Sequence, residues 1–265
     1  MAWSLNPATM PQDAACTSLQ AGRVNRVFRV AHPQGDLVRR ELAPTLVAQR
    51  LGADPAVEVR AQALASRVGL APEILHHDAV AGVTWMPFVE GAPLENLWWQ
   101  DAQRRRAVRH SLETLRAIEI GAELPQLDLR ARLLQLQGRL QDTDACAAQR
   151  TADDCARACA ALERYDWSSP AESCLVHSDL GPHNMLVRAD GSIVMLDWEY
   201  AHRGHVLEDL AGLWVAAGMH ASQLRPLLVE WCAVLEHVHD APGRLETLVV
   251  VRRTLDAQWE SLATG

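Results

Sequence analysis

Two aspartates and one asparagine stand at a spacing that suits phosphoryl transfer. Asp179 and Asn184 lie in an H-x-D-x-x-x-x-N arrangement that opens with His177, and Asp197 follows the apolar run 193–196. Phosphoryl transfer needs an acceptor for the proton of the attacking hydroxyl and oxygen ligands for the Mg²⁺ that bridges the phosphates. A loop between two short strands would present the first pair, and a strand ending at Asp197 would return to the same point. One carboxylate can then face the hydroxyl, while the amide oxygen and the second carboxylate face the metal.

These paired motifs resemble the catalytic loop and the metal-binding segment of aminoglycoside phosphotransferases and choline kinases. The sequence LDWEYA at 196–201, together with EDLA at 208–211, is similar to the branch that contains bacterial thiamine kinase and choline kinase. The resemblance covers roughly residues 18 to 215, and the two motifs are specific only as a pair. It implies a bilobal protein-kinase-like fold, with ATP as co-substrate and Mg²⁺ as cofactor.

The same resemblance implies roles for single residues. Asp179 is the expected catalytic base, and Asn184 and Asp197 are the expected magnesium ligands. His177 matches a histidine whose usual role is structural. Asp209 matches an acid that braces the catalytic loop, so we expect a structural role for it as well.

Two further residues of this stretch have two interpretations each. Glu199 would contact the substrate or the metal, or it would form a salt bridge with an arginine, because carboxylates after a metal-binding strand serve either role. His183 stands where many relatives have a small or basic residue, and it would touch phosphate or substrate. The alternative, which we favour for His183, is a solvent-facing loop histidine.

The loop at 21–26 is the candidate cover for the nucleotide phosphates. In the fold that the chain resembles, the first two strands are joined by a loop whose backbone N–H groups contact the phosphates. The sequence AGRVNR resembles the family's Gly-rich GGxTN turn, with one glycine where many relatives have two. The resemblance implicates Gly22 and Asn25, although an ordinary hairpin turn would look the same.

A cation is expected on the strand that follows this hairpin. Val38 and Arg40 share one face of that strand, and Arg39 points to the other. The family pattern Y-V-L-R places Arg40 toward the α- and β-phosphates; Arg39 is the fallback, and a solvated pair of edge-strand arginines is the alternative. The chain has no lysine, so an arginine must fill this role. The matching position for a bidentate partner is Glu58, unless it is an exposed first-turn glutamate favoured by the helix dipole.

The segment WMPFVEG at 85–91 occupies the place of the expected hinge between lobes. Backbone groups near Pro87 to Val89 are expected to contact the adenine edge, and Met86 to line the pocket. Met86, Phe88 and Val89 are therefore candidate ATP contacts. Because Pro87 has no N–H, neighbouring amides must supply the donors.

The acceptor is expected to be a small hydroxylated molecule, and a cationic alcohol is favoured. Trp198 and Glu199 follow the metal-binding strand, and tryptophan is the best ring for holding an organic cation. Trp214 and Trp259 lie in helical sequence and are expected in the core. A thiamine kinase-like acceptor is favoured, with choline, ethanolamine or an aminoglycoside as the alternative. A nucleotide-binding pseudokinase with a regulatory role is the non-enzymatic alternative, and the lack of an evident activation segment argues against a protein kinase.

The order of elements predicts an α+β fold with a small β-rich lobe at 1–90 and a larger helical lobe at 91–265. The first lobe, after a loose lead-in at 1–15, is expected to hold a strand meander, a helix and a further strand pair. The helical lobe is expected to contain one small β insert that carries the catalytic loop. The expected segments are a meander at 18–42, with a strand at 27–30, a turn at 32–35 and a return strand at 37–42; a helix at 56–69; strands at 73–77 and 83–89; helices at 101–120, 129–140 and 151–164; apolar runs at 174–176 and 193–196 beside an Asp-Gly turn at 190–191; and helices from about 206 to the end.

Composition agrees with a globular protein and excludes some partners. Hydrophobic residues make up 49% of the chain, and the net charge of -8 argues against nucleic-acid binding. No window approaches a membrane span, and residues 1–19 lack the basic and apolar regions of a secretory signal, so a reduced cytoplasm is expected. The six cysteines form no CxxC pair; Cys155 and Cys159, four residues apart, are expected to pack on one helix face. The sequence leaves the oligomeric state open.

Overall fold

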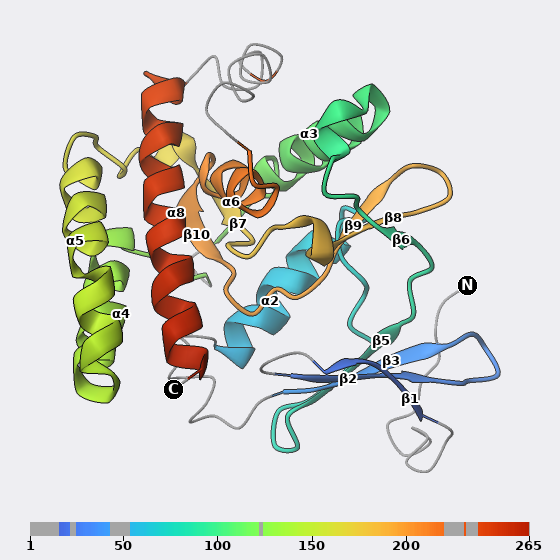
Figure 1. The fold of residues 1–265 in the computed structure, drawn as a ribbon. Coiled ribbons are helices and arrows are strands. Elements are labelled where there is room, and N and C mark those ends of the chain that lie inside the picture. Colours follow the sequence, from blue (N-terminus) through green and yellow to red (C-terminus); the bar gives the residue numbers. More distant parts are fainter. Residues whose placement is uncertain are drawn as a thin grey trace.

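The computed structural model describes residues 16–21, 25–42, 54–121, 124–219, 231 and 238–264. A β-sheet and one helix form the N-terminal part, and most of the helices lie in the C-terminal part (Figure 1). The predicted α+β class is confirmed. The lobe boundary at residue 90 stays a prediction.

The N-terminal sheet is antiparallel with strand order β1-β2-β3-β5-β4. Its strands are β1 (Cys16–Ala21), β2 (Arg26–Val30), β3 (Leu37–Glu41), β4 (His76–Asp78) and β5 (Val83–Pro87). The predicted turn joins β2 to β3, where Gly35 (φ 123°) donates its N–H to the His32 carbonyl at 3.0 Å. In the β2–β3 register Phe28 lies opposite Arg39, and Val27 lies opposite Arg40. The two arginines therefore leave β3 on opposite faces of the sheet.

Helix α2 (Pro55–Ser66) follows the sheet's first three strands. The Asp54 carboxylate accepts the N–H of Ala56 at 2.9 Å and caps the first turn. The helix ends before the predicted residue 69, because the chain leaves the helix and reverses at Gly69, which has φ 78°. Val68, inside the predicted helix range, lies outside the observed helix and is 43% exposed.

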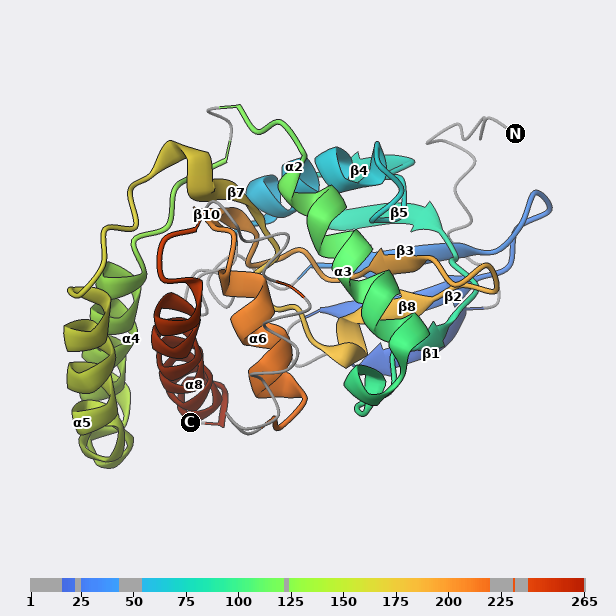
Figure 2. The same cartoon turned by 90° about the horizontal axis from the view of Figure 1, so that it is seen from above.

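Three long helices of the C-terminal part pack side by side (Figures 1 and 2). They are α4 (Leu129–Thr143), α5 (Ala145–Leu162) and α8 (Ala241–Thr264). The prediction that a helix begins at 151 is wrong, because Asp144 ends α4 and caps α5, accepting the Ala147 N–H at 2.9 Å. Cys155 and Cys159 are buried on α5, as expected. All described cysteines are free thiols.

The β insert consists of two small sheets with orders β10-β7 and β6-β8-β9. The strands are β6 (Ala92–Pro93), β7 (Ser173–Val176), β8 (Met185–Val187), β9 (Ile193–Met195) and β10 (His202–His205). The Asp-Gly turn joins β8 to β9, with Gly191 at φ 83°. Strand β10, with the sequence HRGH, was not predicted because it lacks an apolar alternation and forms through long-range pairing, with β7 on one side and with Gln126 on the other.

The remaining helical elements surround this insert. Helix α3 (Ala102–Arg116) packs against β7 and β9, and α6 (Glu208–Ala216) packs against α8 (Figure 2). Short 3₁₀ turns are η2 (Trp98–Gln100), η3 (Pro170–Glu172) and η4 (Pro182–Asn184). The largest buried cluster runs from α2 through α3 and the β insert to α6 and α8. In the described part of the chain, none of the helices has the length and apolarity needed to cross a bilayer.

Candidate active site

A buried carboxylate holds the loop after β7 through hydrogen bonds to its backbone. Asp209 of α6 accepts the backbone N–H groups of His177 at 2.8 Å and Ser178 at 2.9 Å. Burial raises the pKa of Asp209, partly offset by His177 and these hydrogen bonds. This is the bracing contact predicted for Asp209.

His177 ties the same loop to the segment that carries Asp197. Its Nε2 lies 2.8 Å from the Leu196 carbonyl, and its Nδ1 lies 3.3 Å from the Asp179 N–H. A carbonyl can only accept, so Nε2 carries the proton and Nδ1 accepts. Ser178 and Asp197, with φ 69° and 67°, are held in the left-handed region on either side of this contact.

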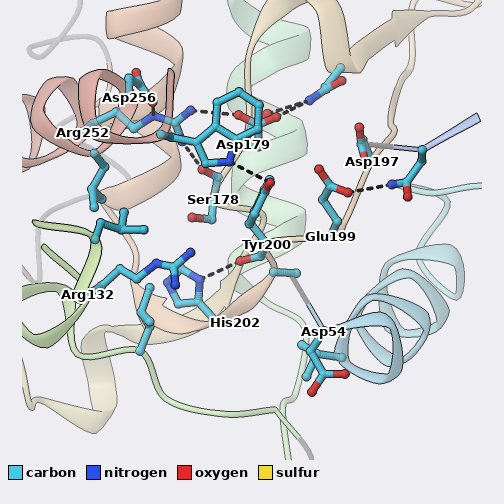
Figure 3. A pocket seen from close by; sticks show the side chains of 18 of the residues that line it. Asp54, Arg132, Ser178, Asp179, Asp197, Glu199, Tyr200, His202, Arg252 and Asp256 are labelled. Atoms are coloured by element: carbon cyan, nitrogen blue, oxygen red, sulfur yellow. Dashed lines mark hydrogen bonds and ion pairs between the residues drawn. The ribbon is translucent and has the colours of Figure 1, made fainter. Parts of the chain in front are cut away.

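Asp179, Asn184 and Asp197 lie close together, as predicted. Asn184 donates from Nδ2 to the Asp179 carbonyl at 2.9 Å and to Asp179 Oδ2 at 3.0 Å. Both contacts use the amide nitrogen, so Oδ1 is the atom with which Asn184 can bind a metal. Asp197 lines the same cavity of about 680 Å³ (Figure 3).

Arg40 reaches this cavity from β3. Its Nη1 lies 3.0 Å from Glu58 Oε1, and its Nη2 pairs with Asp197 and lies 3.5 Å from Glu199 Oε2. Burial lowers the pKa of Arg40, but the three carboxylates outweigh it and hold the pKa above its ordinary value. Arg39 lies on the other face. The predicted strand face and the Arg40–Glu58 pair are confirmed.

Arg39 has surroundings of a different kind. Its Nη2 lies 3.0 Å from Glu41, and its guanidinium lies 4.8 Å from the centre of the Phe28 ring. Neither contact faces the cavity, which Arg39 does not line. The fallback assignment of Arg39 as the phosphate contact is therefore not supported.

Glu199 and Asn25 complete the buried cluster around Arg40. Asn25 donates from Nδ2 to Glu199 Oε2 at 2.7 Å, and both side chains line the cavity. Burial and the nearby Asp197 charge raise the pKa of Glu199 to about 8. The contact with an arginine is present, because Arg40 Nη2 lies 3.5 Å from Glu199 Oε2. Glu199 also lines the cavity, so its contact with substrate or metal stays a prediction.

Whether this site can bind Mg²⁺ depends on the oxygen atoms that its side chains provide. Among the described residues no group of three or more His, Cys, Asp and Glu side chains could hold a metal. Mg²⁺ is commonly bound by one or two protein oxygens together with substrate phosphates and water. Asn184 Oδ1 and the Asp197 carboxylate fit that pattern.

The other predicted nucleotide contacts that the structure describes do not line the cavity. Gly22 lies outside the described residues. Met86 is buried, with its sulfur 3.6 Å from Gln62 Nε2. The Phe88 N–H donates to the Asp36 carbonyl at 2.9 Å, so it is not available to adenine in this structure. Val89, like Met86 and Phe88, is not among the residues that line the cavity beside Asp179.

Trp198 corrects the acceptor prediction. It is completely buried, with its ring 4.5 Å from that of His177 and its N–H donated to the Met195 carbonyl at 3.2 Å. A ring in that position supports the loop and cannot touch an acceptor. Trp259 was expected in the core, yet it lines the cavity and donates from Nε1 to the Tyr200 hydroxyl at 3.0 Å.

Sequence reasoning missed Arg252 of α8. Its Nη2 donates to Asp179 Oδ1 at 2.8 Å, and its Nε lies 2.7 Å from Asp256 Oδ1. Burial alone would raise the pKa of Asp179, but contacts with His183 and Arg252 outweigh it and lower the pKa to about 2. The only local signal was an Arg-Asp pair at i,i+4, which is common on exposed helix faces.

His183 lies at the rim. Its side chain is 66% exposed, and its Nε2 lies 4.0 Å from Asp179 Oδ2. That carboxylate raises the pKa of His183, with burial opposing. The favoured interpretation, a solvent-facing loop histidine, agrees with this placement.

Comparison with protein-family models decides the family. The model of the phosphotransferase enzyme family matches residues 15–248. The chain belongs to this phosphotransferase family. The enzyme class predicted from the sequence, a small-molecule phosphotransferase, is confirmed. No curated protein matches this phosphotransferase in sequence.

Solved structures share the fold of this phosphotransferase. A choline/ethanolamine kinase family protein from Mesorhizobium loti superposes with a TM-score of 0.64 at 17% identity, covering 98% of this chain and 96% of that one. Choline kinase LicA from Streptococcus pneumoniae gives 0.74 at 14%, covering 94% and 85%. APH(2")-IIia in its GDP and kanamycin complex gives 0.67 at 17%, covering 94% and 86%. The predicted kinase-like fold is confirmed.

Proposed function

We propose that this phosphotransferase moves the γ-phosphoryl group of ATP to a hydroxyl of a small cationic alcohol, with a thiamine kinase-like acceptor favoured. The observation that carries the proposal is the convergence of Asp179, Asn184 and Asp197 with Arg40 in one cavity. Structural relatives solved with AMP and with GDP support a nucleotide at this site.

The chemistry follows from the side chains. Asp179 accepts the proton of the acceptor hydroxyl as that oxygen attacks the γ-phosphorus, and the bond from this phosphorus to the β–γ bridging oxygen breaks. Its low pKa keeps the carboxylate ionised, and Asn184 holds it in place. Arg40 offsets phosphate charge and is itself oriented by Glu58. Asn184 and Asp197 would hold Mg²⁺, which neutralises charge on the phosphates.

Side chains on the wall of the cavity favour a cationic acceptor. Tyr200 and Trp259 provide aromatic surface, and Asp256 and Glu260 provide negative charge, all on the cavity wall. Aromatic rings and carboxylates together favour an organic cation. Choline, ethanolamine and aminoglycosides remain alternatives, and the intact Asp179, Asn184 and Asp197 argue against a regulatory pseudokinase.

The test is a screen of nucleotide consumption. Wild-type protein with ATP or GTP and Mg²⁺ is mixed with thiamine, choline, ethanolamine or kanamycin, and the phosphorylated product is identified by mass spectrometry. Asp179→Asn is the blank, and Asp142→Asn, at an exposed aspartate of α4, is the matched control. Nucleotide binding without product from any hydroxylated amine would favour the pseudokinase.

A further inference from the structure

Arg252 of α8 contacts the catalytic loop at two points and its own helix at a third. Its Nη2 donates to Asp179 Oδ1 at 2.8 Å, its Nη1 donates to the Ser178 carbonyl, and its Nε lies 2.7 Å from Asp256 Oδ1. Figure 3 shows Arg252 and Asp256 together on one flank of the cavity, with Asp179 beside them. Because the N–H groups of a guanidinium point in fixed directions within one plane, these contacts hold Arg252 in a single orientation.

The Asp179 carboxylate is held at both of its oxygens. Oδ1 accepts from Arg252, and Oδ2 accepts from Asn184 Nδ2 at 3.0 Å. Two donors on different oxygens fix the plane of the carboxylate, which a single donor would leave free to rotate. An ionised carboxylate can accept about four hydrogen bonds, so these two donors do not saturate it, and the hydroxyl of an acceptor can still donate to Asp179.

Ser178 is held on both sides of its backbone. Its N–H donates to Asp209 Oδ1 at 2.9 Å, and its carbonyl accepts from Arg252. Ser178 has φ 69°, in the left-handed region that is disfavoured for a residue with a side chain and persists where the surroundings hold it. Because Ser178 directly precedes Asp179, its backbone conformation sets the direction in which the aspartate side chain leaves the loop.

Asp256 completes the cluster by orienting Arg252 and compensating its charge. The side chains of Arg252, Asp179 and Asp256 are 23%, 29% and 37% exposed, so water reaches all three only in part. With two carboxylates around one guanidinium, the cluster has more negative than positive charge. Arg252 therefore directs the Asp179 carboxylate without reversing the negative charge that a proton acceptor needs.

We propose that Arg252 is a positioning residue for the proposed base: it holds the Asp179 carboxylate and the Ser178 backbone in the orientation in which Asp179 accepts the proton of the acceptor hydroxyl. Asp256 is the residue that orients Arg252. This inference rests on the proposed transfer to a hydroxyl with Asp179 as base, and it assigns a role in that reaction to the last helix of the chain.

The experiment is a double-mutant cycle between Arg252 and Asp179. Both kcat and the KM for ATP are measured for wild type, the two single variants Arg252→Gln and Asp179→Asn, and the double variant. The reaction contains Mg²⁺ and whichever of thiamine, choline, ethanolamine or kanamycin gives the highest rate. Arg252→Gln should lower kcat about 10- to 100-fold, because a displaced catalytic group loses its alignment with the acceptor. In the Asp179→Asn background the same change should alter kcat by less than about threefold, because residues that act as one unit have non-additive effects.

Three measurements separate positioning from a general structural role. In Arg252→Gln the KM for ATP should stay within about twofold of wild type, because the described contacts of Arg252 are to Ser178, Asp179 and Asp256. Arg252→Lys keeps the charge but loses the planar fork of donors, so it should recover only part of kcat. Arg253→Gln, at the exposed neighbour on α8, is the matched control and should behave as wild type.

Asp256→Asn decides the question if Arg252→Gln does not fold, because this substitution keeps the size of a partly exposed side chain. At saturating acceptor it should lower kcat severalfold in the otherwise wild-type protein. In the Asp179→Asn background it should alter kcat by less than about twofold, because it acts through Arg252 on a carboxylate that is no longer there.

The outcomes are distinct. A wild-type kcat in Arg252→Gln, or an equal loss of kcat with and without the Asp179 carboxylate, would overturn the positioning role and leave the proposed function standing. For Asp256→Asn, the same two results have the same meaning. A wild-type rate for Asp179→Asn would instead remove the proposed base, and no product from any of the four acceptors would overturn the proposed function. This inference fails with either of these last two results.

Discussion

Arg40 and Glu58 form a buried ion pair, with Nη1 of the arginine 3.0 Å from Oε1 of the glutamate. Arg40 comes from β3 and Glu58 from the first turn of α2, so the pair joins the N-terminal sheet to this helix. Both side chains are 7% exposed. The pair holds the Arg40 guanidinium beside Asp197, where nucleotide phosphates are proposed to bind.

Arg40→Ala should raise the KM for ATP and lower kcat, and Arg39→Ala should change little. The expected loss of transition-state stabilisation is about 1.5–3 kcal/mol, the contribution of one charge-assisted hydrogen bond. Steady-state kinetics on both variants measure it. A normal Arg40→Ala beside a crippled Arg39→Ala would contradict the placement.

Asp179→Asn should retain the fold and nucleotide binding but lose turnover. Removing a general base costs about 10²- to 10⁴-fold in rate. Thermal unfolding and nucleotide titration establish that the variant is intact before its rate is compared with that of Asp142→Asn. A rate equal to wild type with the best acceptor would remove Asp179 from the mechanism.

Asp197→Ala should shift the magnesium dependence of activity more than Asn184→Ala does, because it removes a charged ligand rather than a neutral one. Activity is titrated against Mg²⁺ at fixed ATP for both variants. Identical magnesium curves for Asp197→Ala and wild type would refute the proposed metal site.

Asp209→Ala should destabilise the protein, because the buried N–H of His177 and the partly buried N–H of Ser178 lose a charged acceptor. We expect a loss of about 1.5–3 kcal/mol in the free energy of unfolding, and an intermediate loss for Asp209→Asn. Denaturant unfolding measures both. Asp142→Ala, on an exposed helix face, is the control and should stay within about 0.5 kcal/mol of wild type.

His202→Gln should cost more stability at low pH than at high pH. Burial would lower the pKa of His202, but Glu208, whose Oε2 lies 3.0 Å from Nε2, outweighs it and raises the pKa. A raised pKa stabilises the fold below the unfolded value of about 6.5, and this contribution is lost as pH rises through the folded value.

Urea unfolding of wild type and His202→Gln at about pH 6 and about pH 9 tests this sign. The difference in the free energy of unfolding between the two proteins is expected to be smaller at the higher pH. Burial lowers the pKa of His205, which favours stability at higher pH, but His205 is present in both proteins and cancels. A difference that is constant or that grows with pH would show that the His202–Glu208 pair is not charged.

Local patterns in the sequence determined much of the site. The spacing from His177 to Asn184 is short enough that one loop must bring Asp179 and Asn184 together. Strand alternation alone sends Arg40 and Arg39 to opposite faces, because the side-chain period of a strand is two residues. The turn at Gly191 is likewise readable from residue types.

Burial and long-range packing could not be read in the same way. Trp198 and Trp259 are the same residue type, yet one supports the catalytic loop and the other lines the cavity. Strand β10 depends on long-range pairing with β7 and with Gln126. Local sequence patterns do not predict how deeply a side chain is buried or which distant strand a segment pairs with.

The family, the fold class and the catalytic loop were therefore determined by the sequence itself, through short spacings and local periodicity. The contact between Arg252 and the catalytic loop was decided only by tertiary structure. Arg252 reaches Asp179 from 73 residues away because α8 packs against α6, whose Asp209 holds the same loop. Such a contact depends on how helix faces fit together in space, and this fit leaves no fixed spacing in the chain.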